Sequence, residues 1–125
     1  MRRLVIVLVA LHAAVLLVHD AAHRELGVHL STWQTIFAYL VIVAAPVLAA
    51  LLVFTAYQRL GFALLAISML GALLFGLYHH YILVSPDHVS HLPLGEAQGL
   101  FRATAAAMGV LELAGVGLGV WSRRQ

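Results

Sequence analysis

Four long apolar segments, separated by short polar ones, dominate the pattern of the chain. They run over residues 4–26, 32–57, 60–84 and 97–121. Each is long enough to cross a hydrocarbon core of about 30 Å, which takes about 20 helical residues. The pattern predicts an all-α integral membrane protein, a four-transmembrane-helix bundle that forms a single transmembrane domain over residues 1–125.

Local signals indicate where these helices begin and end. Gly27 follows the first segment as a helix stop, and Ser31 with a Gln three residues later has the pattern of a capping box before the second. Pro46 is expected to kink that second helix. The Ser-Pro-Asp sequence at 85–87 has the order of a helix start, so we expect a short interfacial helix in the loop between the third and fourth segments.

Composition supports a membrane protein and excludes several kinds of site. The chain is 63% hydrophobic and 10% charged, whereas soluble domains carry about 25% charged residues. The lipid bilayer is therefore its expected partner. A net charge of only +2 gives no support to nucleic-acid binding. The absence of cysteine excludes disulfides, thiolate metal sites, Fe–S clusters and covalent c-type haem.

Arginine is distributed unevenly between the two ends of the expected helices. Cytoplasmic loops are enriched in Lys and Arg, so the richer side is expected to face the cytoplasm. This predicts both termini inside (N-in/C-in) and histidine-rich loops facing the periplasm or exterior, in a bacterial plasma membrane. The richer side holds Arg2, Arg3, Arg59, Arg123 and Arg124, and the other side holds Arg24 and Arg102.

Histidine is concentrated near the side expected to face outward. His12, His19 and His23 lie at offsets of 7 and 11 residues, which places them within about 40° of arc on one face of a helix. On the third helix, His80 continues a row of small residues at 68, 72 and 76 that suits close helix packing, and His79 lies beside it. Two helices can therefore bring four imidazoles together.

Clustered imidazoles are typical ligands of Zn, Cu and Fe, and two histidines at i and i+4 let one helix supply two of them. A single histidine at the membrane interface is more often solvated or hydrogen-bonded to a carbonyl. Several ionisable groups together favour a metal or haem site, because each is energetically costly to place within the membrane. We expect Asp20 to act as a further ligand or to orient an imidazole, and the short helix to cover the site. The predicted metal-site residues are His19, His23, His79, His80, Asp20, His88 and His91.

Two short segments resemble motifs of known metalloproteins. The sequence from His19 to His23, His-Asp-Ala-Ala-His, resembles the first histidine box of membrane fatty-acid desaturases, and His79-His80 is similar to the paired histidines of their later boxes. The His-x-x-His-His pattern of those boxes is absent, so the likeness implies shared metal-ligand chemistry rather than membership. Four helices with histidines also resemble membrane b-type cytochromes, although the second helix has no histidine.

Glu112 is a second signal, separate from the cluster. It and His12 both lie about 21 Å in from the expected outer ends of their helices, at 1.5 Å per residue, so they can pair in mid-membrane. Such a pair could transfer protons or bind a second metal, or the two side chains could only neutralise each other's charge. Gly115 and Gly119 have the GxxxG spacing of helix packing or dimerisation, which leaves a homodimer or a larger membrane complex open.

Together these features predict a membrane protein that binds a metal ion or metal cofactor through its histidine cluster, for metal handling or small-scale redox chemistry. Two alternatives remain. The chain could be a His-ligated iron or copper oxidoreductase acting on a lipid-like or quinone substrate, or a structural, pigment-binding or haem-binding subunit of a larger complex. The sequence does not decide whether the protein is an enzyme or which metal it binds.

Overall fold

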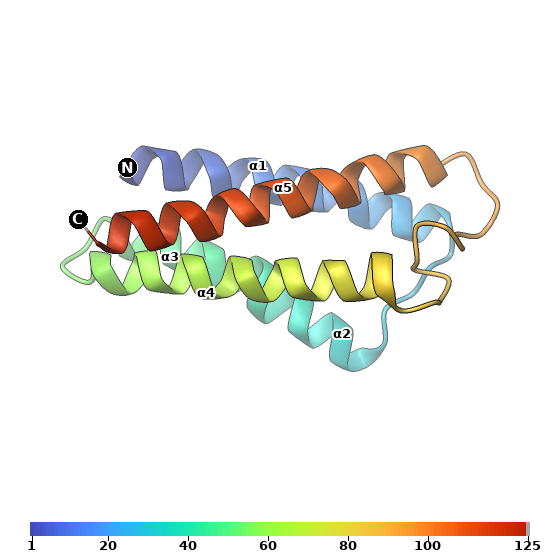
Figure 1. Ribbon diagram of the computed structural model, residues 1–125, viewed down its shortest axis with the longest axis horizontal. Helices are drawn as coiled ribbons and strands as arrows, with labels where there is room; N and C mark the ends of the chain where they lie inside the picture. Colours follow the sequence, from blue (N-terminus) through green and yellow to red (C-terminus); the bar gives the residue numbers. More distant parts are fainter. Residues whose placement is uncertain (125) are drawn as a thin grey trace.

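The computed structural model describes residues 1–124, which contain helices and no strand (Figure 1). Four helical spans are long and apolar enough to cross a membrane. The first is α1 and the last is α5, and the two between them each include a π-helical segment. Their bounds are α1 Arg2–Glu25; α2 Thr32–Phe37, η1 Ala38–Ala44 and α3 Ala45–Leu52; α4 Gln58–Leu77 and η2 Tyr78–Ile82; and α5 Gln98–Arg123.

The second span ends at Leu52, five residues before the expected end at position 57. The chain turns back tightly there, and Gly61 of α4 makes the close approach possible. A Cβ at Gly61 would lie 2.8 Å from the backbone nitrogen of Val53, closer than real Cβ contacts. The apolar run through residues 53–56 therefore belongs to the turn, which hydropathy alone could not distinguish from helix.

The backbone before Pro46 is π-helical from Ala38 to Ala44. Proline has no backbone N–H, so the carbonyl four residues earlier, that of Ile42, cannot receive its usual α-helical hydrogen bond. Inserted π-helical turns of this kind are a known source of helix irregularity and often occur at functional sites. The irregularity expected near Pro46 therefore appears as π-helical backbone in the turns before it.

The loop between η2 and α5 contains turns rather than a helix. Backbone bonds run from His88 N to Ser85 O and from His91 N to His88 O, and each closes a single turn. Ser85 accepts a hydrogen bond from the backbone N–H of Asp87, but no helix follows. The short interfacial helix expected here is not confirmed, because these residues fold back over the bundle end instead of continuing in one direction.

The two ends of the bundle differ in composition. Both termini and the turn between α3 and α4 lie at one end, which we call the arginine end (Figure 1). Residues 26–31 and 83–97 lie at the other, which we call the histidine end (Figure 1). Consecutive spans therefore run antiparallel to each other. The orientation of the two ends in a membrane stays a prediction.

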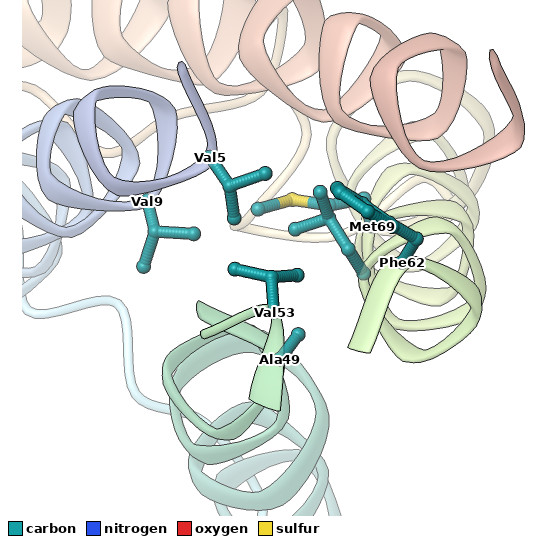
Figure 2. Close-up of a cluster of buried hydrophobic side chains, with 7 residues drawn as sticks. Val5, Val9, Ala49, Val53, Phe62 and Met69 are labelled. Carbon is teal, nitrogen blue, oxygen red and sulfur yellow. The ribbon is translucent and has the colours of Figure 1, made fainter. Parts of the chain in front are cut away.

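The arginine end has an apolar core. Its buried members converge from α1, α3 and α4 (Figure 2). On α5, Gly115 and Gly119 face α4, where a Cβ at Gly119 would lie 2.7 Å from the carbonyl oxygen of Phe62. The GxxxG face is therefore used for helix packing inside the chain. The core residues are Val5, Val9, Ala49, Val53, Phe62, Leu65 and Met69.

Candidate metal centre

Three buried histidines from two helices meet at the histidine end. His19 and His23 come from α1, and His80 comes from η2 at the end of the third span. One imidazole nitrogen from each lies within 4.8 Å of the others, a spacing at which they could hold a metal ion. We call these residues the histidine trio. Their convergence confirms that the sequence brings a possible metal site together from separate helices.

The end of α1 orients His23. Gly27 adopts a φ of +66°, which suits glycine, and two backbone bonds close the helix, from Val28 N to His23 O and from Gly27 N to Arg24 O. This Schellman arrangement brings the Val28 carbonyl to 3.2 Å from His23 Nδ1, which donates to it. The Nε2 atom of His23 is then the nitrogen with a free lone pair.

His19 is oriented by Thr104 of α5. The Thr104 hydroxyl lies 2.7 Å from the Leu100 carbonyl and donates its single proton to the helix backbone. It therefore accepts from His19 Nδ1, which lies 2.8 Å away. As in His23, the proton is on Nδ1 and the free lone pair is on Nε2.

His80 is oriented in the same way by the loop. Its Nδ1 lies 3.1 Å from the backbone carbonyl of Asp87 and donates to it. All three imidazoles thus use Nδ1 as the donor to a neutral oxygen, the pattern that fixes the tautomer of metal-binding histidines. Three Nε2 lone pairs remain for a shared ligand.

The separation of two of these nitrogens matches a tetrahedral metal site. His19 Nε2 and His80 Nε2 are 3.3 Å apart. When both imidazoles are neutral with the proton on Nδ1, their Nε2 lone pairs face each other, and a cation between them removes the repulsion. Two imidazole nitrogens bound to one tetrahedral ion at 2.0–2.1 Å are separated by about 3.3 Å.

Asp87 lies beside two members of the trio, and the sequence analysis did not predict it as a ligand. Its Oδ1 lies 3.3 Å from His23 Nε2 and 3.2 Å from His80 Nδ1. Neither contact has hydrogen-bond geometry, and Oδ1 is a buried oxygen without a hydrogen-bond partner among the described residues. Because buried polar atoms are normally satisfied, this oxygen is a candidate fourth ligand.

The charge state of Asp87 suits that role. Burial raises the pKa of its carboxyl group, but the interactions with His80 and with the other two histidines of the trio more than offset this effect, so the pKa lies below its ordinary value. The carboxylate is therefore ionised at neutral pH. Its position in the histidine-rich loop could have suggested Asp87 as a ligand. The Ser-Pro-Asp order at 85–87 instead predicted only a helix start.

Apolar residues enclose the trio. Phe101 of α5 is fully buried, with its ring 4.6 Å from that of His19 and 4.8 Å from that of His23. Leu92 from the loop packs in the same cluster as Leu26 and Val28, and so covers the bundle end. This packing excludes water from one side of the site and strengthens electrostatic interactions there.

The other residues predicted for the site lie outside the trio. Asp20 pairs with Arg24 on the surface, with Oδ2 2.6 Å from Nη2. His79 points toward the second span, where Gln34 Nε2 lies 3.1 Å from its Nδ1. In the loop, exposed His91 lies 3.2 Å from His88 between their Nδ1 atoms.

His12 and Glu112 form a separate buried pair. His12 Nε2 lies 3.2 Å from Glu112 Oε1, and each residue is only 2% exposed. The pair joins α1 to α5 between the histidine trio and the apolar core of the arginine end. Each group thereby relieves the cost of burying the other.

A cavity of about 450 Å³ adjoins the trio. His23, His80 and Asp87 line it at the histidine end, and Glu112 is also part of its lining. Apolar residues of α1, η1, α4 and α5 form most of the remaining wall. The candidate metal centre therefore borders an internal space rather than being closed on all sides.

Comparisons with protein families, curated proteins and solved structures found no match to this chain.

Proposed function

We propose that the protein binds one transition-metal ion through His19, His23 and His80, with Asp87 as the fourth ligand. The observation that carries this proposal is the shared placement of the ring nitrogens in the trio. Three Nδ1 donors are taken by neutral oxygens, and the Nε2 atoms of His19 and His80 face each other at 3.3 Å. Metal handling at the histidine end is the function that this geometry supports best.

The geometry favours a single tetrahedral ion. Zn²⁺ commonly takes four nitrogen and oxygen ligands in this arrangement, while copper and iron also accept imidazole. A haem iron held by two axial imidazoles would need their nitrogens about 4 Å apart on opposite sides of the metal. The 3.3 Å separation of the His19 and His80 nitrogens supports a bare ion better than a haem.

The experiment is elemental analysis of the full-length protein, purified in detergent without chelator, together with an absorbance spectrum. We expect about one metal ion per chain and no Soret band. The double variant His19→Ala/His23→Ala should lose the ion, since it removes two of four ligands. The matched control His88→Ala/His91→Ala also removes two histidines, from the loop, and should keep it.

Two results would overturn the proposal. One is the absence of stoichiometric metal that added Zn²⁺, Cu⁺ or Fe²⁺ cannot restore at neutral pH. The other is full metal retention in His19→Ala/His23→Ala. Circular dichroism of both double variants separates loss of the ligands from loss of the fold.

The cavity favours a second candidate function, a His-ligated iron or copper oxidoreductase acting on a membrane-soluble molecule such as a lipid or quinone. Two trio members and Asp87 line the space that such a molecule would occupy. Redox-active metal in the elemental analysis would support this candidate, and zinc alone would favour metal handling.

For the membrane arrangement, we propose that the arginine end faces the cytoplasm of a bacterial cell and the histidine end faces outward. The support is the excess of arginine near the two termini and at the start of α4. Single cysteines at positions 58 and 90 provide the test, because the chain has none of its own. A membrane-impermeant thiol reagent added outside should label only position 90, and labelling of only position 58 would reverse the arrangement.

A further inference from the structure

The cavity beside the trio has an unusual wall for an internal space in a helical bundle. Part of its lining is buried, such as Ala72 of α4 and Met108 of α5, and part is strongly exposed, such as Leu17 of α1 and Tyr39 of η1. A space with both kinds of wall reaches from the bundle interior to the lipid-facing surface. It therefore opens sideways into the region that acyl chains occupy.

The opening lies between the first and second spans. At the histidine end α2 lies apart from α1, and α4 and α5 are also further apart there than at the arginine end (Figure 1). The extensive contacts of α1 are with α5 and α3, and those of α2 and η1 are within their own span and with α4. The π-helical segment before Pro46 belongs to the span that departs from the bundle.

The lining distinguishes an apolar chain from water as the occupant. Leu16, Ile42 and Met108 are among the residues along the wall. Of the three carboxylates in the lining, Asp20 and Asp87 belong to the polar histidine end, and Glu112, which lies deeper, turns Oε1 toward His12. Water requires two to four polar partners, whereas apolar cavities stay dry and accept apolar ligands. Polar lining at the histidine end, including Arg24 and Tyr81, suits a small polar head at the level of the membrane interface.

We propose that this cavity binds one single-chain amphiphile from the bilayer, with its apolar tail between α1 and η1 and its polar head at the histidine end. The volume of about 450 Å³ lies in the lower half of the usual range for ligand pockets, about 300–1,000 Å³, so it suits one chain better than a two-chain phospholipid. The site goes beyond the metal centre and does not require an ion in it.

Two glycines of α5 provide a matched pair of variants. Gly109 lines the cavity, and a Cβ there would meet only Leu73 Cδ1, at 3.8 Å, so a longer side chain can grow into the space. Gly117 is exposed on the same helix, and a Cβ there would meet nothing within 4 Å. Gly109→Leu should fill the site, and Gly117→Leu makes the same change on the surface.

The experiment uses full-length protein in phosphatidylcholine vesicles containing palmitate with a mid-chain diazirine. After irradiation, we expect labelling at buried wall positions such as Ala72 and Met108. In Gly109→Leu this labelling should fall by about tenfold, a factor that corresponds to about 1.4 kcal/mol and lies within the usual cost of overpacking. Gly117→Leu should leave it unchanged, as should prior removal of metal with a chelator.

A parallel sample replaces the palmitate probe with a two-chain phosphatidylcholine carrying the same diazirine. Labelling of the buried wall by this probe alone would overturn the single-chain proposal and indicate ordinary bilayer lipid. Labelling confined to exposed positions, or equal labelling in the two glycine variants, would overturn the site itself. Because labelling is read without metal as well as with it, failure of the metal proposal is a separate outcome.

Discussion

The two ends of the bundle are built from the same four spans but are packed in opposite ways. At the arginine end, α1, α3 and α4 meet through apolar residues, and glycines bring α5 against α4 at contact distance. At the histidine end, the second span lies apart from α1, polar groups are buried beside apolar ones, and a cavity remains. A closely packed half can hold the helices while the other half carries costly polar groups and empty space.

This contrast explains how a small membrane protein can support a buried polar site. Intramembrane ionisable residues are expensive and are usually associated with function. Here the Nδ1 atom of each imidazole in the trio bonds to a backbone carbonyl or to the Thr104 hydroxyl, and the apolar core lies away from the trio at the opposite end. The predictions below disturb one end at a time.

Overpacking the arginine end should have the largest effect on stability. A Cβ at Gly119 would lie 2.7 Å from the backbone oxygen of Phe62 and 2.8 Å from the backbone nitrogen of Ala66, so α4 and α5 would have to separate. We expect Gly119→Leu to cost about 3 kcal/mol or more in the free energy of unfolding. Thermal unfolding in detergent followed by circular dichroism measures it. Gly117→Leu, on the exposed face, should be nearly neutral.

Acid should empty the histidine end while leaving the bundle folded. Imidazole must be deprotonated to bind metal, and its reference pKa is about 6.5, so occupancy should fall as the pH drops through about 6 to 5. Asp87 does not cause this loss, because its pKa is lowered and its contribution is lost only at a still lower pH. As the pH falls, metal content should decrease while helical content stays constant. Loss of both at the same pH would contradict the contrast between the two ends of the bundle.

Removing the negative charge of Asp87 should weaken metal binding without disturbing the core. Within residues 1–124 the buried Oδ1 has no hydrogen-bond partner, so the variant Asp87→Asn loses a ligand charge rather than a structural bond. We expect at least about tenfold lower affinity, measured by competition with a chromophoric chelator. Asp20→Asn is the matched control, since Asp20 pairs with Arg24 on the surface. Equal affinities in the two variants would remove Asp87 from the ligand set.

The smallest effect is expected where the two ends meet, at the pair formed by His12 and Glu112. A double-mutant cycle of His12→Ala and Glu112→Gln should give a coupling energy of about 0.6 kcal/mol and at most about 1.7 kcal/mol, the average and the maximum found for hydrogen bonds within membranes. Reversible unfolding in mixed micelles measures it. Additive effects would indicate that the 3.2 Å contact contributes nothing to stability.

Helical periodicity made much of this arrangement predictable. His12, His19 and His23 share one face because helix geometry relates them at a fixed angle, and all three are buried. His80 also lies on the face expected from its spacing. Gly27 predicted the helix stop, and the stop in turn brings the Val28 carbonyl to His23. These are local relations within a few turns of backbone.

The loop residues were less predictable. His79 adjoins His80 in sequence, yet it contacts Gln34 of the second span and lies away from the trio. Asp87 had the signal of a helix start, but its loop folds over the bundle end and brings its carboxylate to His23 and His80. Sequence spacing gives little information where the chain reverses direction, because no fixed angle relates one residue to the next.

The sequence by itself determined that the chain forms four helices able to span a membrane and that histidines gather near one end, because hydropathy and helical angle are properties of short stretches of chain. Only the tertiary structure decided which imidazoles meet, that Asp87 joins them, and that a cavity opens between α1 and η1. Those features depend on how closely separate helices approach. That approach is set by contacts such as Gly119 against Phe62, between residues far apart in sequence.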